Sequence, residues 1–479
     1  MQRELIIGGQ SCSPASGQYF EVLAPGSGRV LAACARAGAD DVNAAVTAAR
    51  LGFQSWSSMA PATREEVLLR AAQLVAEEGE QRFLDNLIDE SGSAITKARF
   101  EISYTVDLLR TAAGEVRRLY GDTFPNDNPN RVSMVFREPM GVVAVISPYN
   151  APLSLLTKMA AFPLAAGNSI VIKPSEETPL TALAFGELLL EAGLPPEAIS
   201  VLPGFGAECG GPLTSHEDVD CVAFTGSTAT GVMVGAESAR RMRPCQLELG
   251  GKSALLVLRD ADPRKAAEIA AQGIFTHGGQ ICMANSRILV ERPIFEAFSQ
   301  ALKAAAEAIH LGDLRDEKTQ YGPLINQRAV DKVLLHVNNA VADGASILTG
   351  GEIQQGLTIK PTVVVEPDRS STLWREESFG PVASLVAIDN LDEGIAVAND
   401  SDYGLSAAVL TNNMQWGMRA AREIRSGSVH IGMHSFQSNA LAPIGGFKYS
   451  GVGRSGGKYS TEEFTEVKWV SMSLEDSGQ

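Results

Sequence analysis

Hydrophobic positions follow a helical rhythm in the first quarter of the chain. After the acidic pair at 40–41, apolar residues recur at spacings of three and four, which is the pattern of an amphipathic helix with acidic residues at its start. Residues 62–79 and 97–119 repeat this spacing. The pattern therefore predicts that the first quarter is mainly helical, with one apolar stripe of each helix facing a core.

The spacing of apolar residues changes after this helical part. Short runs rich in β-branched residues appear, and longer helical patterns separate most of them; the runs span 141–146, 169–173, 199–202, 221–225 and 245–249. Strands that alternate with helices in this way are typical of a parallel sheet covered by helices. Residues 252–447 alternate in the same manner and are predicted to form a second domain. The expected fold class is α/β, with a Rossmann-like parallel sheet in the first domain.

Two further segments have the pattern of exposed strands. Residues 124–140 open with turn residues and then alternate, and residues 464–474 alternate near the C-terminus. Such strands either pair between subunits or form solvent-facing ribbons. The expected division of the chain is 1–120 with 141–251 as one domain, 252–447 as the second, and 121–140 with 448–479 as a small β extension for oligomerisation.

Polar or glycine-rich residues follow each predicted strand of the first domain. The endings are SPYN, KPSE, PGFG, TGS and GGK. In open α/β sheets, ligands bind in the crevice outside the carboxyl ends of the strands. Five such endings on one edge predict a binding site for a long ligand, such as a dinucleotide.

A literal G-x-G-x-x-G motif occurs elsewhere, at Gly451, Gly453 and Gly456. That motif binds phosphate only inside a strand–helix–strand unit, and too little chain follows it here. We therefore interpret it as a flexible turn. Residues 224–231 are the better phosphate-contact candidate, because glycine lets the backbone approach closely and a helix N-terminus follows.

Charge and cysteine usage exclude several function classes. The chain holds 40 Lys and Arg against 56 Asp and Glu, a net charge of −16, which argues against binding to nucleic acid or anionic membranes. Its most apolar stretch, residues 151–172, contains a lysine, a proline and an asparagine, so no membrane span is expected, and no signal peptide is evident. The six cysteines form no metal-ligand cluster. These features predict a cytoplasmic protein with free thiols and no metal.

Cys282 lies in the unusual stretch HGGQICMANSR. A cysteine nucleophile needs activation, because a free thiol is mostly protonated at neutral pH. His277 is the nearest histidine, but a Cys/His pairing would need a further orienting residue. Glu248, at the end of the fifth strand of the first domain, is the stronger candidate base. The alternative role of Glu248 is a structural pair with Lys252.

These motifs together resemble the aldehyde dehydrogenase superfamily. The segments SPYN, KPSE, FTGS, ELGGK, GGQIC and EESFGPV occur in the family's order and cover nearly the whole chain. The resemblance implies that the first domain binds NAD and that the second carries the catalytic cysteine. It also implies a small-molecule aldehyde as substrate and a homodimer or homotetramer.

The resemblance further implies how the reaction proceeds. Cys282 would attack the aldehyde carbon to give a thiohemiacetal, and the side-chain amide of Asn150 with the backbone N–H of Cys282 would stabilise the oxyanion. Hydride transfer to NAD would leave a thioester. Glu248 would activate the water that hydrolyses this thioester. A relative that passes the acyl group to coenzyme A often lacks the glutamate found here at 248.

The cofactor contacts are also implied by the family's motifs. Lys173 and Glu176 would contact the adenosine ribose, where a carboxylate favours NAD over NADP. Glu377 would bind the nicotinamide ribose. The full expected set is Ser147, Pro148, Tyr149, Lys173, Ser175, Glu176, Gly206, Gly226, Ser227, Gly231, Leu249, Glu377 and Phe379.

The sequence departs from the commonest family pattern near the substrate. Tyr149 stands where many members have tryptophan, and Ser455 where some have a second glutamate proposed as a proton relay. Ala151 replaces a bulky aromatic residue. The forms YNAPL and GQICM, with Lys158 and the C-terminal GRSGG…EFTEVKW, look most like the benzaldehyde, vanillin and salicylaldehyde dehydrogenase branch. A small residue at 151 would leave room for a flat ring.

The resemblance therefore predicts an aromatic aldehyde as substrate. The expected pocket residues are Ala151, Leu155, Lys158, Ile281, Met283, Phe436 and Ile444, of which Met283 and Phe436 could equally be ordinary packing residues. Aliphatic aldehydes or semialdehydes are the alternative substrates. A non-enzymatic role like that of lens crystallins is the alternative function.

Overall fold

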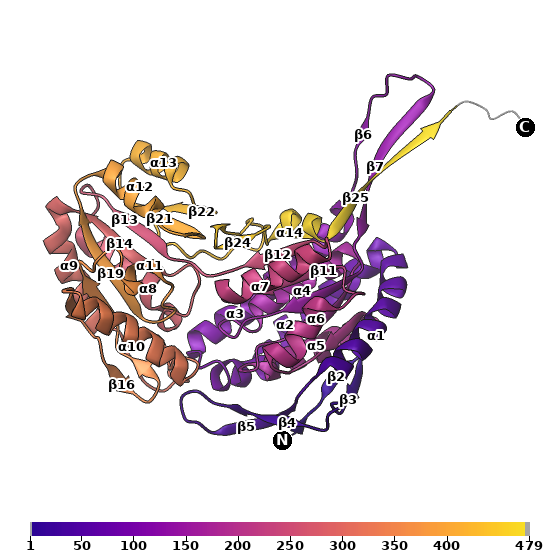
Figure 1. Cartoon of the computed structure of the whole chain (residues 1–479), viewed down its shortest axis with the longest axis horizontal. Helices are drawn as coiled ribbons and strands as arrows, with labels where there is room; N and C mark the ends of the chain where they lie inside the picture. Colours follow the sequence, from indigo (N-terminus) through magenta and orange to yellow (C-terminus); the bar gives the residue numbers. More distant parts are fainter. Residues whose placement is uncertain (1, 475–479) are drawn as a thin grey trace, which may run out of the picture.

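The structure, a computed structural model that describes residues 2–474, contains two large sheets with helices on both faces of each. Figure 1 shows the two sheets side by side, with the N-terminal half of the chain in one lobe and residues from 253 to about 431 in the other. A thin β ribbon projects from the N-terminal lobe.

The first sheet has eight strands in the order β24-β12-β11-β8-β9-β10-β2-β3. Its central five strands are parallel and buried: β8 (Val142–Ile146), β9 (Ser169–Lys173), β10 (Ile199–Val201), β11 (Cys221–Thr225) and β12 (Cys245–Glu248). They coincide with the five predicted runs. Strands buried on both faces show continuous apolar runs, and this is why the sequence pattern located them.

Helices cover both faces of this sheet. One face packs against α1 (Ala39–Ser58), α6 (Gly211–Ser215) and α7 (Thr228–Arg240), and the other against α2 (Pro61–Asp89), α3 (Ile95–Glu115), α4 (Ser154–Ala166) and α5 (Pro179–Glu191). The α/β fold class is confirmed.

The prediction of a mainly helical first quarter is wrong for its first 35 residues. This segment forms five short strands: β1 (Gln2–Arg3), β2 (Leu5–Ile7), β3 (Gln10–Cys12), β4 (Tyr19–Leu23) and β5 (Val30–Ala35). β2 and β3 extend the large sheet, and the other three form a small sheet of their own. Strands of two to six residues carry too few alternations for a period-two pattern to stand out.

The second sheet has seven strands in the order β15-β18-β19-β14-β13-β21-β22, and all neighbours except β15 and β18 run parallel. The strands are β13 (Ser253–Val257), β14 (Asn285–Glu291), β15 (Ser346–Thr349), β18 (Thr362–Val365), β19 (Val382–Ile388), β21 (Ser406–Leu410) and β22 (Ser428–Ile431). Its principal helices are α8 (Pro263–Phe275), α9 (Arg292–Glu307), α10 (Gln327–Ala342), α12 (Leu391–Asn399) and α13 (Met414–Glu423). Short elements complete this half: α11 (Thr372–Arg375), β16 (Ile353–Gln355), β17 (Thr358–Ile359), β20 (Tyr403–Gly404) and β23 (Phe447–Lys448).

The projecting ribbon is a three-stranded antiparallel sheet of β6 (Thr123–Phe124), β7 (Arg131–Pro139) and β25 (Thr465–Ser473). β25 lies at its edge and is mostly exposed. Within the expected extension from 448, α14 (Gly457–Glu463) packs against α3 and α4 and also contacts β25; the boundary at 448 stays a prediction. Residues 475–479 of the expected extension lie outside the described residues.

The glycine run near the C-terminus is also not a free turn. Gly451–Val452 form β24, an antiparallel edge strand that pairs with Leu247 and Glu248 of β12. Gly451 has a φ of 145°, and a Cβ there would lie 2.1 Å from the Leu247 carbonyl oxygen. Glycine is therefore required because the backbone passes so close to β12.

Candidate active site

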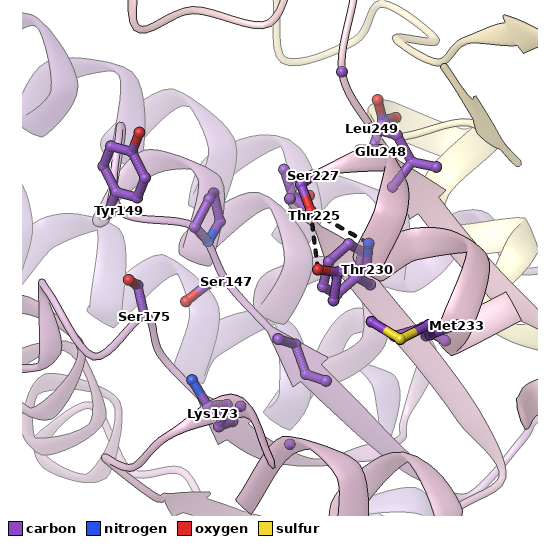
Figure 2. A pocket seen from close by; sticks show the side chains of 18 of the residues that line it. Ser147, Tyr149, Lys173, Ser175, Thr225, Ser227, Thr230, Met233, Glu248 and Leu249 are labelled. Atoms are coloured by element: carbon purple, nitrogen blue, oxygen red, sulfur yellow. Dashed lines mark hydrogen bonds between the residues drawn. The ribbon is translucent and has the colours of Figure 1, made fainter. Parts of the chain in front are cut away.

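A cavity of about 1480 Å³ opens where the strands β8, β9, β11 and β12 end, between the two lobes. Figure 2 shows side chains from several of these strand ends converging on it. Sixteen of the residues expected from the sequence line this one cavity: Ser147, Pro148, Tyr149, Asn150, Leu155, Lys173, Ser175, Glu176, Gly206, Gly226, Ser227, Glu248, Leu249, Cys282, Glu377 and Phe379. The strand endings therefore do meet at one edge.

Gly231 does not line the cavity. It lies buried in the first turn of α7, where a Cβ would come 2.2 Å from Leu249 Cδ2. Its small size lets the helix pack against the segment after β12. This packing role is what the structure shows for Gly231, and its contact with a cofactor stays a prediction.

Most of the expected substrate residues also lie outside this cavity, and only Leu155 of that set lines it. Phe436 packs against His434 with ring centroids 4.3 Å apart, and Ile444 pairs with Ser455 through the backbone. Ile281 borders a separate, much smaller cavity. Ala151 and Met283 are partly buried, and neither lines the main cavity.

Lys158 is buried in α4, close to Glu248 and Cys282. Its ammonium group interacts electrostatically with Glu248 and with Cys282, while burial lowers its pKa. A buried amine beside a carboxylate and a thiol stabilises negative charge on either group. Lys158 thus lies within electrostatic reach of the thiol and of Glu248, although it does not line the main cavity.

Cys282 follows a short helix with an unusual backbone. η4 (Thr276–Gly279) contains three consecutive residues with positive φ, of which Gly279 is so close to Gly380 that a Cβ would lie 2.0 Å from its carbonyl oxygen. The glycines before Cys282 are therefore required by the positive φ angles and by the close approach of Gly279 to Gly380. Burial and the nearby Glu377 and Glu248 carboxylates raise the pKa of the Cys282 thiol to about 12. The thiol needs a base to become nucleophilic.

His277 is not that base. The groups that act electrostatically on the Cys282 sulfur are Glu377, Glu248 and Lys158. The His277 ring is buried, and burial holds its pKa well below the ordinary range for histidine. The Cys/His pairing weighed from the sequence therefore does not form.

Glu248 ends β12 opposite Thr225 and Gly451. Its Oε1 atom is buried and has no hydrogen-bond partner among the described residues. Burial raises the pKa of Glu248 to about 7, against the lowering effect of Lys158 and Arg454. A carboxyl group with such a pKa can both accept and release a proton near neutral pH.

The alternative pair between Glu248 and Lys252 is absent. Lys252 is buried beside Arg287 and Glu377, and burial with the Arg287 charge lowers its pKa to about 7. Glu248 does not contribute to this shift. The two residues follow each other closely in sequence, but the chain leaves the first sheet between them and enters the second.

Asn150 lies directly beside the loop that carries the thiol. Its Nδ2 atom donates a hydrogen bond to the carbonyl oxygen of Gln280, at 2.8 Å, two residues before Cys282. An amide group has two N–H donors, so one remains for an oxygen atom in the cavity. Asn150 is thus placed to donate a hydrogen bond to a ligand bound at Cys282.

Other parts of the cavity are lined by backbone and polar groups. The Ser227 hydroxyl caps the N-terminus of α7 by accepting from Thr230 N at 3.3 Å, as Figure 2 shows. A Cβ at Gly226 would lie 2.6 Å from the Phe224 ring. Lys173 Nζ donates to Pro174 O at 2.7 Å and approaches Glu176 Oε2 at 3.4 Å. A helix N-terminus beside a lysine favours bound anions.

Glu377 and Phe379 connect the two ends. Glu377 Oε1 accepts a hydrogen bond from Gly251 N at 3.0 Å, and burial raises the pKa of this carboxyl group. Phe379 has a φ of 55° and meets the Tyr149 ring edge-on, with centroids 6.0 Å apart. The glycine at 250 is needed because a Cβ would lie 2.6 Å from Glu377 Oε2.

Sequence reasoning missed several residues that line the cavity. One face of α7 contributes Thr230, Met233, Glu237 and Arg240, and α10 contributes Arg328 and Lys332. The spacing of three and four along α7, counted from the Gly226–Ser227 turn, could have identified that face. No local pattern indicates α10, because only the packing of the two lobes brings it to the cavity.

Among residues 2–474, no group of His, Cys, Asp and Glu side chains could hold a metal ion. Within the same residues, no helix is both long and apolar enough to cross a membrane.

Known proteins resemble this chain over its whole length. The model of the aldehyde dehydrogenase family matches residues 12–470. A vanillin dehydrogenase from Pseudomonas fluorescens is 38% identical, over 98% of this chain and 97% of that protein. A glutarate-semialdehyde dehydrogenase from Pseudomonas putida is 34% identical, over 99% and 98%.

A solved structure shows the same fold. An aldehyde dehydrogenase from Bacillus cereus in complex with NAD+ is 37% identical and superposes with a TM-score of 0.97, over 99% of this chain and 97% of that one. The cavity described above fits NAD by its own chemistry: it is larger than the roughly 300–1,000 Å³ of ordinary ligand pockets, and a capped helix N-terminus lines one end. The chain therefore belongs to the aldehyde dehydrogenase family and is an NAD-dependent aldehyde oxidoreductase.

Proposed function

We propose that this chain oxidises an aldehyde to a carboxylic acid through a covalent intermediate on Cys282. The observation that carries the proposal is that one cavity brings together three groups: the Cys282 thiol, the Glu248 carboxyl with an unpartnered buried oxygen, and the Asn150 amide. A nucleophile, a base and an oxyanion donor are the set that acyl chemistry on a thiol requires.

The first half of the reaction forms the thioester. The Cys282 thiol transfers its proton to Glu248, and the sulfur adds to the aldehyde carbon, which gives a thiohemiacetal. The Asn150 amide and the Cys282 backbone N–H donate hydrogen bonds to the new oxyanion. NAD, when bound, supplies the acceptor for the hydride that leaves this carbon. The buried Lys158 ammonium stabilises negative charge on the sulfur before attack.

The second half releases the acid. Glu248 first returns the thiol proton to solvent and then accepts a proton from a water molecule, whose oxygen adds to the thioester carbon. The C–S bond then breaks, the departing thiolate takes up the proton held by Glu248, and the carboxylic acid is released. The pKa of about 7 suits Glu248 to this exchange, because the carboxyl can return its proton to solvent at neutral pH. Ser455 carries no carboxylate, so any relay onward from Glu248 takes another route.

The expected cofactor residues hold NAD in an order that follows the cavity. Lys173 and Glu176 bind the adenosine ribose, and the carboxylate of Glu176 disfavours the 2′-phosphate of NADP. Ser227 and the first turn of α7 bind the pyrophosphate. Glu377 binds the nicotinamide ribose, and Phe379 packs beside it against Tyr149.

We propose aromatic aldehydes as the preferred substrates. The vanillin dehydrogenase relative supports this choice. Burial of an aryl group should add roughly 1–3 kcal/mol of transition-state binding over a short aliphatic chain, or about 5- to 150-fold in kcat/KM. The glutarate-semialdehyde dehydrogenase relative makes a semialdehyde the second candidate.

A panel of substrates tests both the dehydrogenase activity and the preference for aromatic aldehydes. Purified protein is mixed with NAD and with benzaldehyde, vanillin, propanal or glutarate semialdehyde, and NADH formation is followed at 340 nm. NADH formation with any aldehyde supports the dehydrogenase, whereas none would favour a crystallin-like role. Higher kcat/KM on propanal than on benzaldehyde contradicts the aromatic assignment. Release of the free acid without coenzyme A separates hydrolysis from acyl transfer.

The exposed edge of β25 supports one further proposal, a homodimer or homotetramer. This strand pairs along one side with β7, and its other side is the open edge of the ribbon sheet. Long open edges tend to pair with another strand. Light scattering of the purified chain gives its mass, and a monomer at micromolar concentration would contradict the proposal.

A further inference from the structure

Lys97 on α3 reaches the backbone of the turn that carries Asn150. Its Nζ atom donates three hydrogen bonds, to Asn150 O at 2.8 Å, to Glu101 Oε2 at 2.9 Å and to Ser93 Oγ at 3.0 Å. An ammonium group has three donors, so all of them are used. The Lys97 side chain is only 14% exposed.

Glu101 holds the other end of the same turn. Its second oxygen, Oε1, accepts a hydrogen bond from the backbone N–H of Leu153 at 3.0 Å, just before α4 begins. The Glu101 side chain is 1% exposed. One buried ion pair thus binds the turn at both ends: the ammonium holds the carbonyl of residue 150 and the carboxylate holds the N–H of residue 153.

The opposite side of Asn150 is bound to the nucleophile's loop. The Asn150 amide donates to the Gln280 carbonyl, and the Gln280 side chain accepts from Ile325 N at 3.0 Å. A chain of hydrogen bonds therefore runs from Lys97 through Asn150 to the segment that leads into Cys282. Each member of this chain is buried or nearly so.

We infer that the Lys97–Glu101 pair positions the Asn150 amide against the Cys282 sulfur. The inference rests on the proposed function, in which this amide stabilises the oxyanion. Donors of that kind act only when fixed where the charge develops, and a shift of about 1 Å can cost about 100-fold in rate. Lys97 and Glu101 are positioning residues, because their bonds go to the turn's backbone and not to the cavity.

Arg99 offers a comparison, because its ion pairs lie at the surface and do not contact the turn. Arg99, two residues along the same helix, binds Glu80 and Glu317 at the surface, with a side chain 41% exposed. Exposed pairs of this kind contribute little to stability. Arg99 has no bond to the 150–153 turn, so Arg99→Met is a matched control for Lys97→Met.

The experiment compares these variants in the full chain with NAD and the best aldehyde of the panel. Lys97→Met should lower kcat and the rate of the NADH burst by about 10- to 100-fold, with KM and the NAD dissociation constant changed less than threefold. Arg99→Met should leave all four quantities near wild type. Unchanged kcat in folded Lys97→Met overturns the inference.

A double-mutant cycle separates positioning from general destabilisation. If Lys97 acts through the Asn150 amide, Asn150→Ala and the double variant should have the same kcat, because the amide that Lys97 positions is gone. Effects that multiply in the double variant would mean that Lys97 acts independently and would overturn the inference.

A second variant covers the case that Lys97→Met does not fold. Lys97→Arg keeps a cation beside Glu101 but presents a longer, planar donor, so kcat should fall less than in Lys97→Met, and the same cycle applies. If the wild-type chain is inactive with every aldehyde, the proposed function is refuted. If the wild type is active and the Lys97 variant has the same activity, only the positioning role of Lys97 is refuted.

Discussion

The two ends of the cavity treat charge in opposite ways. At the thiol end, defined by Cys282 and Glu248, the two groups are partly buried, the nearby Lys158 is buried, and Glu248 Oε1 has no partner among the described residues. At the cofactor end, defined by Lys173, Glu176 and Ser227, polar groups are hydrogen-bonded to each other or to neighbouring backbone.

This contrast indicates where the protein gives up folding free energy to keep groups that take part in chemistry. An unsatisfied buried polar group costs about 1–3 kcal/mol of folding free energy. Such groups persist where their unusual pKa values serve a reaction. The cofactor end only has to bind a ligand, and hydrogen-bonded polar groups with a helix N-terminus are sufficient for that. Substitutions at the thiol end should therefore change chemistry, and those at the cofactor end should change binding.

The largest effect is expected for Cys282→Ala. Loss of the nucleophile should reduce kcat by more than about 1,000-fold, while the NAD dissociation constant stays within twofold, because the sulfur takes part only in chemistry. Steady-state NADH formation and fluorescence titration with NAD measure the two quantities. Cys245→Ala, at another partly buried cysteine, is the control. Substantial turnover by Cys282→Ala would show that another group is the nucleophile.

Glu248→Gln should separate the two half-reactions. The amide keeps the shape but cannot take a proton from water, so steady-state turnover should fall by about 100-fold or more. Because Glu248 also takes the thiol proton in the proposed mechanism, the NADH burst in stopped-flow measurements should form more slowly than in wild type, with hydroxide from solvent as the base. Its amplitude should still be close to one per active site before the slow phase. If neither the burst nor the steady-state rate differs from wild type, water is activated elsewhere.

The pH dependence of kcat should follow the raised pKa of Glu248. Below a pH of about 7 the carboxyl is protonated and cannot accept a proton, so kcat should fall by about tenfold per pH unit. Above it the carboxylate is present and this limb levels off. Initial rates between pH 5 and 9 measure the profile, and Glu248→Gln should lose this limb. A wild-type limb near pH 4.5 would mean that burial does not shift this group.

At the cofactor end, Glu176→Gln should have a smaller effect. Removal of a partly exposed negative charge should raise the NADP to NAD ratio of kcat/KM by about 3- to 10-fold, since exposed charges are screened. The neighbouring Glu177→Gln serves as control, because Glu177 is already bound to Asn326. An equal rise in both variants would assign the effect to net charge and not to the ribose contact.

An effect of similar size is expected for Ala151→Phe. This residue does not line the main cavity, so a ring there reaches the substrate only by displacing neighbours. We expect kcat/KM on benzaldehyde to fall by about 5-fold or more relative to propanal. Equal losses on both aldehydes would remove Ala151 as a determinant of the substrate class.

The sequence predicted the core strands better than the chain ends. The runs 169–173 and 221–225 coincide with β9 and β11 because a strand buried on both faces is apolar throughout. The five strands before residue 36 were not predicted because each is short. The role of Gly451 was not predicted because a glycine in a turn and a glycine in a close backbone contact cannot be distinguished in sequence.

By itself, the sequence determined the α/β class, the positions of the five central strands along the chain and the chemical groups at their ends, because periodicity and residue type are local properties. It also singled out Cys282 and Glu248, and the resemblance of its motifs to the family added Asn150. Only the tertiary structure decided which groups face the thiol: Lys158 instead of His277, and a Glu248 oxygen with no partner instead of a pair with Lys252. Burial and distance between residues far apart in sequence arise from packing of the two lobes, and these quantities set the pKa values.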